Sequence, residues 1–159
     1  WDEDSITMSV DAVRACLRSS AGGAVRALTF ASTTPVFSDL QNASMVAAAS
    51  GLGSDLSTLD TAGSLRAGTS ALLRALESAQ GGDAVVVAAD GRHGKPGSLQ
   101  EMQYGAGSFA LRIGAGDVIA KYLGGASSAS QFVDHFRAEV EHRLRGAQLV
   151  LLVGGGVAA

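Results

Sequence analysis

Hydrophobic and polar positions along the chain follow two different periodicities. Residues 5–18 have apolar side chains at spacings of three and four, which is the period of an amphipathic helix. Their apolar face is formed by Ile6, Val10, Val13 and Leu17. Residues 84–89 (AVVVAA) form a short continuous apolar run, typical of a strand covered on both faces. The chain therefore combines helices with buried strands.

Helical and strand-like segments alternate from one end of the chain to the other. The expected helices are residues 5–18, 38–50, 64–80 and 131–144, and the expected strands are 24–32, 56–60, 84–89, 108–113 and 118–123. This alternation predicts an α/β fold, with a mostly parallel mixed sheet, helices on both faces and antiparallel last strands. Ser64 is expected to cap the third helix.

Composition and charge exclude several classes of protein. Apolar residues make up 47% of the chain, too many for a disordered tail, and the 21 glycines suit helices packed closely on a sheet. The net charge of −3 is scattered, which argues against a nucleic-acid surface. No apolar run is long enough for a membrane span. Cys16 is the single cysteine, so no disulfide framework is expected. A reduced, cytoplasmic setting is expected instead.

Some residues of catalytic type have a simpler structural interpretation. Cys16 lies near the apolar stripe of its helix, so a buried, inert thiol is expected. Residues 92–97 are basic and glycine-rich, but Pro96 follows Lys95 where a phosphate loop needs Ser or Thr, so a turn is favoured over a loop that touches a CoA phosphate. Glu101 is expected to be buried with a backbone partner.

Two further patterns are weak signals for a site. Gly105 and Gly107 are expected to permit close strand packing rather than to hold a phosphate. His135, Glu139 and His142 fall on one face of an expected helix, but a further metal ligand is not in sight. A solvated helix face is therefore expected, and no metal site.

One segment resembles a known catalytic turn. Residues 60–69 (DTAGSLRAGT) resemble the strand-to-helix turn that holds the nucleophile in thiolase-fold condensing enzymes, which in archaeal-type hydroxymethylglutaryl-CoA synthases is Asp-x-x-x-Ala-Cys-Lys-Ala-Gly-Thr. Four other stretches resemble that family in the same order and spacing: DEDSITMSVDAVRA, FASTTPVFSDLQNASMVAAASGL, AADGRHGKPGSLQE and QYGAGSFALRIG. The resemblance covers about residues 2–123.

The resemblance implies one half of the two-half thiolase-like fold. Residues 1–137 would form this N-terminal half, with its first strand outside the chain, and residues 138–159 are an unassigned helix and tail. Half of such a fold would expose a large apolar surface. The chain is therefore expected either to form a homodimer or to belong to a longer protein with a C-terminal half.

The family's catalytic residues are replaced in this chain. In the family a cysteine is acylated by an acyl-CoA, a glutamate acts as general acid and base, and a histidine from the C-terminal half orients the second substrate. Here the cysteine position holds Leu65 and the glutamate position holds Thr33. The resemblance implies an acyl-CoA pocket lined by Thr33, Ser64 and Leu65, with a CoA thioester as substrate and no cofactor. It leaves the catalytic residues unassigned.

Two functions remain open. The first is an acyl-CoA-processing protein that makes or breaks a carbon–carbon bond without a cysteine nucleophile, of the retro-aldolase type. Related thiolase-like proteins without the cysteine pair with a small OB-fold and zinc-ribbon protein, which suggests a similar partner. The second is a non-catalytic thiolase-like scaffold subunit of an acyl-CoA enzyme complex. Turnover of a CoA thioester discriminates the two.

Overall fold

The computed structural model describes residues 3–78 and 82–128. The chain divides into two units, each described by itself. The first comprises residues 1–92 and 106–123, and the second comprises residues 93–105 and 124–159. Within the described residues, no helix has the length and apolar character needed to cross a membrane.

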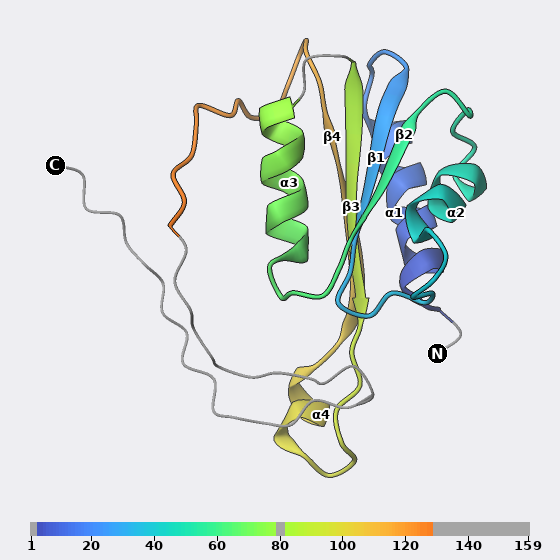
Figure 1. Cartoon of the computed structure of the whole chain (residues 1–159), viewed down its shortest axis with the longest axis vertical. Helices are drawn as coiled ribbons and strands as arrows, with labels where there is room; N and C mark the ends of the chain where they lie inside the picture. The colour runs from blue at the N-terminus through green and yellow to red at the C-terminus, as the bar shows by residue number, and fades with distance from the viewer. Residues whose placement is uncertain (1–2, 79–81, 129–159) are drawn as a thin grey trace, which may run out of the picture. The chain divides into compact units, whose positions relative to one another are not determined.

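The first unit is built on a four-stranded mixed sheet. Its strands are β1 (Val25–Ala31), β2 (Ser57–Thr61), β3 (Asp83–Gly91) and β4 (Ala106–Ile113). They lie in the order β2-β1-β3-β4 (Figure 1). The strands β2, β1 and β3 are parallel, whereas β4 pairs antiparallel with β3. The predicted α/β class, with a mostly parallel sheet and an antiparallel last strand, is confirmed.

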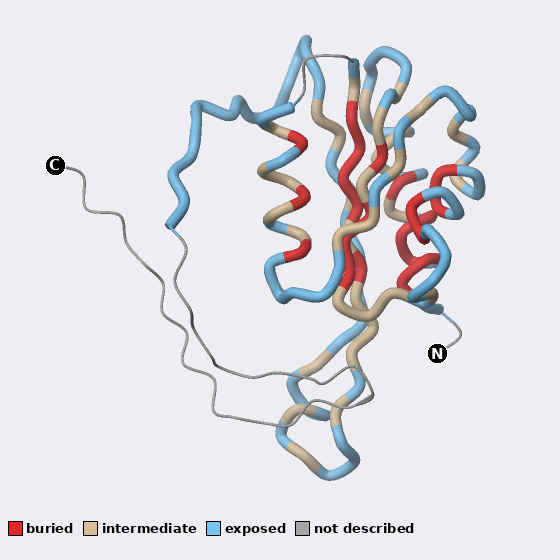
Figure 2. Tube along the Cα trace, in the orientation of Figure 1, coloured by how far each residue is buried: buried red, intermediate tan, exposed pale blue. Residues whose placement is uncertain are grey.

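Helices cover both faces of this sheet. The helices α1 (Ser5–Ser19) and α2 (Asn42–Ala49) pack on one face, and α3 (Ala67–Ser78) packs on the other (Figure 1). On the α1 and α2 face the sheet contributes large side chains: Leu28, Phe30, Val85 and Val87. On the α3 face the core is built of small ones: Ala31, Ala67, Ala71, Ala75 and Val86. The two buried layers flank the sheet in Figure 2.

The first helix begins where its sequence supplies a cap. The carboxylate of Asp4 accepts hydrogen bonds from the backbone N–H groups of Ile6 and Thr7, and the Thr7 hydroxyl accepts one from the backbone of Asp4. This reciprocal pattern is a capping box, which satisfies backbone donors that the first turn leaves free. The helix predicted at residues 5–18 is observed with its end displaced by a single residue.

Two other helices begin later than predicted. The α2 helix starts at Asn42, because residues 37–41 form a turn in which the Asn42 amide bonds to both backbone groups of Phe37. The α3 helix starts at Ala67, so Ser64 does not cap its first turn. Instead, the Ser64 hydroxyl accepts from the backbone N–H of Arg66 in the turn that precedes the helix.

The strand predicted at residues 118–123 is absent from the structure. The segment has no regular secondary structure, and Ile119 and Leu123 are fully exposed. Alternating apolar residues favour a strand only where a neighbouring strand supplies hydrogen bonds. No neighbouring strand pairs with it among the described residues.

The second unit contains a short helix, α4 (Leu99–Gln103), which was not predicted. The Ser98 hydroxyl caps it by accepting from the backbone N–H of Glu101. The Glu101 carboxylate accepts from the N–H of Gly97 at 2.6 Å, so the predicted backbone partner is present. The prediction that Glu101 is buried is wrong, since it is exposed.

Two further expectations are corrected, and others fall outside the described residues. Cys16 is half-buried rather than buried. A methyl group added at Gly105 or Gly107 would meet nothing within 4 Å, so close packing does not explain these glycines. The helix expected at residues 131–144, with its two histidines and Glu139, and the boundary at residue 137 lie outside the described residues.

Candidate functional site

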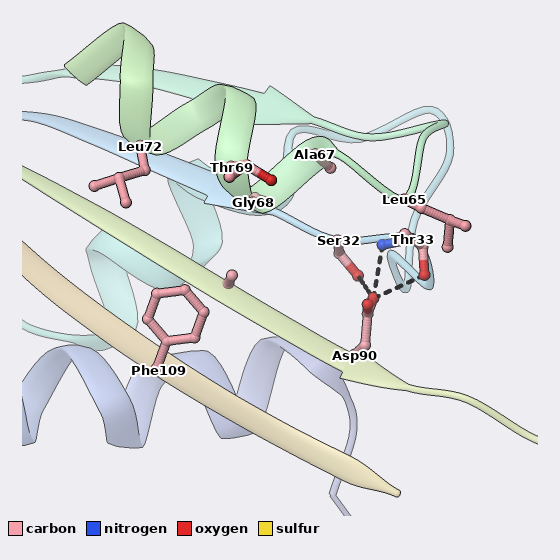
Figure 3. A pocket seen from close by; sticks show the side chains of 11 residues that line it. Ser32, Thr33, Leu65, Ala67, Gly68, Thr69, Leu72, Asp90 and Phe109 are labelled. Carbon is pink, nitrogen blue, oxygen red and sulfur yellow. Dashed lines mark hydrogen bonds between the residues drawn. The ribbon is translucent and has the colours of Figure 1, made fainter. Parts of the chain in front are cut away.

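A pocket of about 340 Å³ lies in the first unit, where β1 and β3 end and α3 begins. Adjacent parallel strands bring their carboxyl ends to the same edge of the sheet, which is where ligands commonly bind in α/β folds. The side chains that line one end of the pocket are polar: Ser32, Thr33 and Asp90. Leu72 and Phe109, at the other end, are apolar (Figure 3). The pocket therefore suits a ligand with one polar and one apolar end.

Small residues at the start of α3 bring its backbone close to the sheet. Ala67 is buried, and Gly68 faces Ala88 of β3 closely enough that an added Cβ would lie 3.5 Å from the alanine methyl. Larger side chains here would occupy the pocket. The Ala-Gly pair of the motif at residues 60–69 thus helps to keep the pocket open.

Asp90 is the hydrogen-bonding centre of the polar end. Its Oδ1 atom accepts from the Ser32 hydroxyl at 3.1 Å, the Thr33 backbone N–H at 2.7 Å and the Thr33 hydroxyl at 3.0 Å. Figure 3 shows these bonds crossing from the end of β3 to the loop after β1. Asp90 is also the only residue with an acidic or basic side chain among those that line the pocket.

Arg92 approaches the same cluster from the end of β3. Its Nε and Nη2 atoms donate to the Thr33 hydroxyl oxygen at 3.1 and 2.8 Å, and Nη2 lies 3.7 Å from Asp90 Oδ2. The Thr33 hydroxyl therefore joins a cation to a carboxylate. A second bridge, from the Gly91 N–H to the Thr34 hydroxyl, fixes the two loops together.

The predicted site residues do not all meet. Thr33 and Leu65 both line the pocket, from different elements, and 53% of Leu65 is exposed. Ser64 is not among the lining residues, and its hydroxyl is used in the turn before α3. Arg92, interpreted from sequence as part of a turn, is held beside the pocket by Thr33.

Sequence reasoning missed Asp90. The signal was present, because Asp90 directly follows the apolar run at residues 84–89, and a charged residue at the carboxyl end of a buried strand is well placed to face a ligand. What the sequence did not show is that residues 32–34 converge on it. Among the described residues, no group of three or more His, Cys, Asp or Glu side chains could hold a metal ion.

Comparison with curated proteins finds hydroxymethylglutaryl-CoA synthases among the relatives of this chain. No protein-family model matches the chain. The chain is 30% identical, over 148 residues, to a hydroxymethylglutaryl-CoA synthase of Thermococcus onnurineus and to one of Pyrococcus furiosus. In both cases the match covers 89% of this chain and 42% of the relative. The chain thus spans about two fifths of the length of these relatives.

Solved structures agree on the fold. MvaS in complex with 3-hydroxy-3-methylglutaryl coenzyme A matches with a TM-score of 0.78 and 23% identity, over 91% of this chain and 37% of that one. A 3-oxoacyl-(acyl carrier protein) synthase III from Pseudomonas aeruginosa PAO1 matches with a TM-score of 0.64 and 26% identity, over 73% of this chain and 37% of that one. The four-stranded unit is therefore a thiolase-like fold that corresponds to part of these enzymes.

Proposed function

The chain is a partial-length homologue of hydroxymethylglutaryl-CoA synthase, and on that premise we propose that its pocket binds a 3-hydroxyacyl-CoA thioester and breaks or makes the bond between C2 and C3. The pair of residues that carries this proposal is Asp90 and Leu65. The pocket has a carboxylate able to transfer a proton, and a leucine where the resemblance of residues 60–69 would place the family's nucleophile. An acyl-enzyme at that position is therefore excluded.

A retro-aldol cleavage suits this pair because it needs no covalent intermediate. The carboxylate of Asp90 accepts the proton of the 3-hydroxyl group, the C2–C3 bond breaks, and its electron pair forms the enolate of the thioester. Protonation at C2 by the same carboxyl group then gives acetyl-CoA, and C3 leaves as a ketone. The reaction is balanced without a co-reactant, and the reverse direction is the corresponding condensation.

The polar end holds Asp90 in place. The hydroxyls of Ser32 and Thr33 both donate to its Oδ1 atom, which orients the carboxylate that accepts the substrate proton. The apolar end, with Leu72 and Phe109, suits the hydrocarbon part of the acyl group. In this proposal Thr33 and Leu65 bind substrate, while Asp90 alone transfers protons.

The test is a turnover assay with 3-hydroxy-3-methylglutaryl-CoA, followed by chromatography and mass spectrometry. Formation of acetyl-CoA and acetoacetate in equal amounts supports the proposal. Intact-mass analysis after incubation with acetyl-CoA and acetoacetyl-CoA should show no acyl adduct, and an adduct on any residue would contradict a mechanism without a nucleophile. Absence of cleavage in the full assembly described next would also reject it.

We further propose that the active assembly contains more protein than this chain. On β4, 49% of Phe109 and 36% of Leu111 are exposed, on the α3 face of the sheet. A C-terminal half or a second copy of the chain would cover such side chains. Ultracentrifugation that finds a monodisperse monomer of the isolated chain would contradict dimerisation, and assays should then include the missing half or an OB-fold and zinc-ribbon partner.

A scaffold role is the second candidate. The observation that favours it is again Leu65, because its exposed side chain supplies contact area and no reactive group. A scaffold subunit should leave the activity of its partner intact when Asp90 is replaced, whereas the lyase proposal requires Asp90 for turnover.

A further inference from the structure

We propose that Arg92 is the anion-binding residue of this pocket and selects acyl groups that carry a carboxylate. The inference rests on the proposed function, because it names the substrate class of the same pocket. Three observations carry it: the contacts that hold the guanidinium, the donors that those contacts leave over, and the amphipathic lining of the pocket.

The first observation is how firmly Arg92 is held. Two of its nitrogens donate to a single oxygen, the hydroxyl of Thr33, at 3.1 and 2.8 Å. The same hydroxyl donates to Asp90 Oδ1 at 3.0 Å. A long, flexible side chain is thereby fixed against Thr33, which lines the pocket, and a preorganised group binds a ligand with less loss of conformational entropy.

The second observation is that Arg92 and Asp90 form only a long ion pair. The bonds from Ser32 and Thr33 all converge on Oδ1, whereas Arg92 Nη2 lies 3.7 Å from Oδ2. This distance is longer than a charge-assisted hydrogen bond and differs from the bidentate pairing that arginine makes with a carboxylate. The contrast within the same unit is Arg112, whose Nη2 lies 2.6 Å from Asp83 Oδ2 while Nε donates to the same oxygen.

The third observation is the donor inventory of the guanidinium. Arginine has five N–H donors in a planar fork. The two hydrogen bonds to Thr33 use the N–H of Nε and one N–H of Nη2. The Arg92 side chain is 20% exposed, so it is neither buried in the core nor fully solvated. A planar fork in this setting fits the two oxygens of a carboxylate.

The pocket defines what such a carboxylate would be attached to. Its apolar end takes a short hydrocarbon segment, and its polar end lies at Thr33, next to Arg92. In a dicarboxylic acyl thioester the free carboxylate would lie at Thr33 and Arg92, and the hydrocarbon segment against the apolar side chains of the pocket. A phosphate of CoA presents the same anionic oxygens, so the test must separate the two sources.

Calorimetric titration of the full chain separates them with three probes: free 3-hydroxy-3-methylglutarate, its neutral diamide, and desulfo-CoA. Arg92→Gln should weaken binding of the free acid by about tenfold or more. It should change the affinity for the diamide by less than about twofold. Arg92→Lys, which keeps the charge but loses the planar fork, should fall between.

Arg74→Gln is the matched control, since Arg74 is an exposed arginine of α3 that is not among the pocket residues, and it removes the same charge. A loss confined to the free acid supports selection of acyl carboxylates. A loss confined to desulfo-CoA overturns that selection and assigns Arg92 to a CoA phosphate. Equal losses for acid and diamide overturn the anion-binding role altogether.

The outcomes distinguish this inference from the proposed function. If the wild-type chain binds the acid through Arg92 but never cleaves the thioester, the lyase proposal fails while the anion site stands. If cleavage occurs and Arg92→Gln leaves the preference for acid over diamide unchanged, the lyase proposal stands while the anion site at Arg92 fails. Circular dichroism melts of both Arg92 variants show whether either has merely failed to fold.

Discussion

Two aspartates at the carboxyl ends of parallel strands, Asp60 on β2 and Asp90 on β3, have different roles. Asp60 uses both oxygens on the start of α2: Oδ1 accepts from the Ala43 N–H and Oδ2 from the Asn42 N–H, each at 2.7 Å. Asp90 uses Oδ1 on the loop after β1 and faces a pocket. Position at the end of a strand therefore does not by itself place a carboxylate in a pocket. Asp60 is covered by the start of α2, whereas Asp90 lines an open volume.

The two strand ends also differ in whether a neighbouring helix needs the carboxylate as a cap. The start of α2 has no side-chain cap of its own, because Gln41 at the N-cap position makes no capping bond. Asp60 replaces that cap from a neighbouring strand, and the side chain of the buried Asn42 also donates to it at 2.9 Å. At the end of β3, within the part of the chain that the structure describes, Asp90 bonds to the loop after β1 rather than to a helix start, and the small residues of α3 leave an open volume beside it.

The largest expected effect is on turnover. Asp90→Asn should reduce cleavage of 3-hydroxy-3-methylglutaryl-CoA by roughly a thousandfold, because an amide cannot accept the hydroxyl proton. Stability should fall by only about 1 kcal/mol, since an oxygen acceptor remains for the loop after β1. Steady-state kinetics measures the first value and urea unfolding the second. Full activity in Asp90→Asn would show that Asp90 does not transfer the proton, and its contrast with Asp60 would then be structural only.

The largest effect on stability is expected at the other strand end. Asp60→Ala leaves the backbone N–H groups of Asn42 and Ala43 at the start of α2 without their acceptor, and it should lower the free energy of unfolding by about 3 kcal/mol. The control is Asp39→Ala, which removes an exposed aspartate from the loop before α2 and should cost less than about 0.5 kcal/mol. Similar losses for the two variants would show that the Asp60 cap contributes nothing special.

A cysteine placed at position 65, in the pocket beside Asp90, should react with acetyl-CoA. In a Cys16→Ser background, Leu65→Cys should gain a single acetyl group on incubation with acetyl-CoA, because Leu65 lines the pocket and a thiol near the start of a helix tends to have a lowered pKa. Intact-mass spectrometry detects the adduct. Cys16→Ser alone should remain unmodified, and absence of an adduct in the double variant would place the thioester elsewhere.

The smallest effect on stability is expected from adding a methyl group at Gly68, in the pocket lining contributed by α3. Gly68→Ala should raise the free energy of unfolding by about 0.5 to 1 kcal/mol, since the new Cβ would lie 3.5 Å from Ala88 and alanine favours a helix. Gly82→Ala is the contrast: Gly82 has a φ of +131°, and an added Cβ would lie 2.6 Å from Arg26 Cγ. Thermal melts should therefore move in opposite directions for the two variants.

The sequence by itself determined the elements whose signals are local. The continuous apolar run of β3 and the apolar stripe of α1 each fix an element through neighbouring residues, and both elements are observed. The ordered motifs around residues 60–69 also indicated the family, and relatives at 30% identity confirm that resemblance. Because these signals need no distant partner, they can be interpreted without a structure.

Only the tertiary structure decided what depends on residues far apart in the chain. It placed Arg92 on Thr33, 59 positions away, and gave α2 its cap from Asp60, 18 positions after Asn42. It also left residues 118–123 without the strand that their pattern favoured, because a strand exists only through its neighbours. Sequence patterns record the periodicity of a segment, whereas hydrogen bonds and pockets are made by segments that the fold brings together.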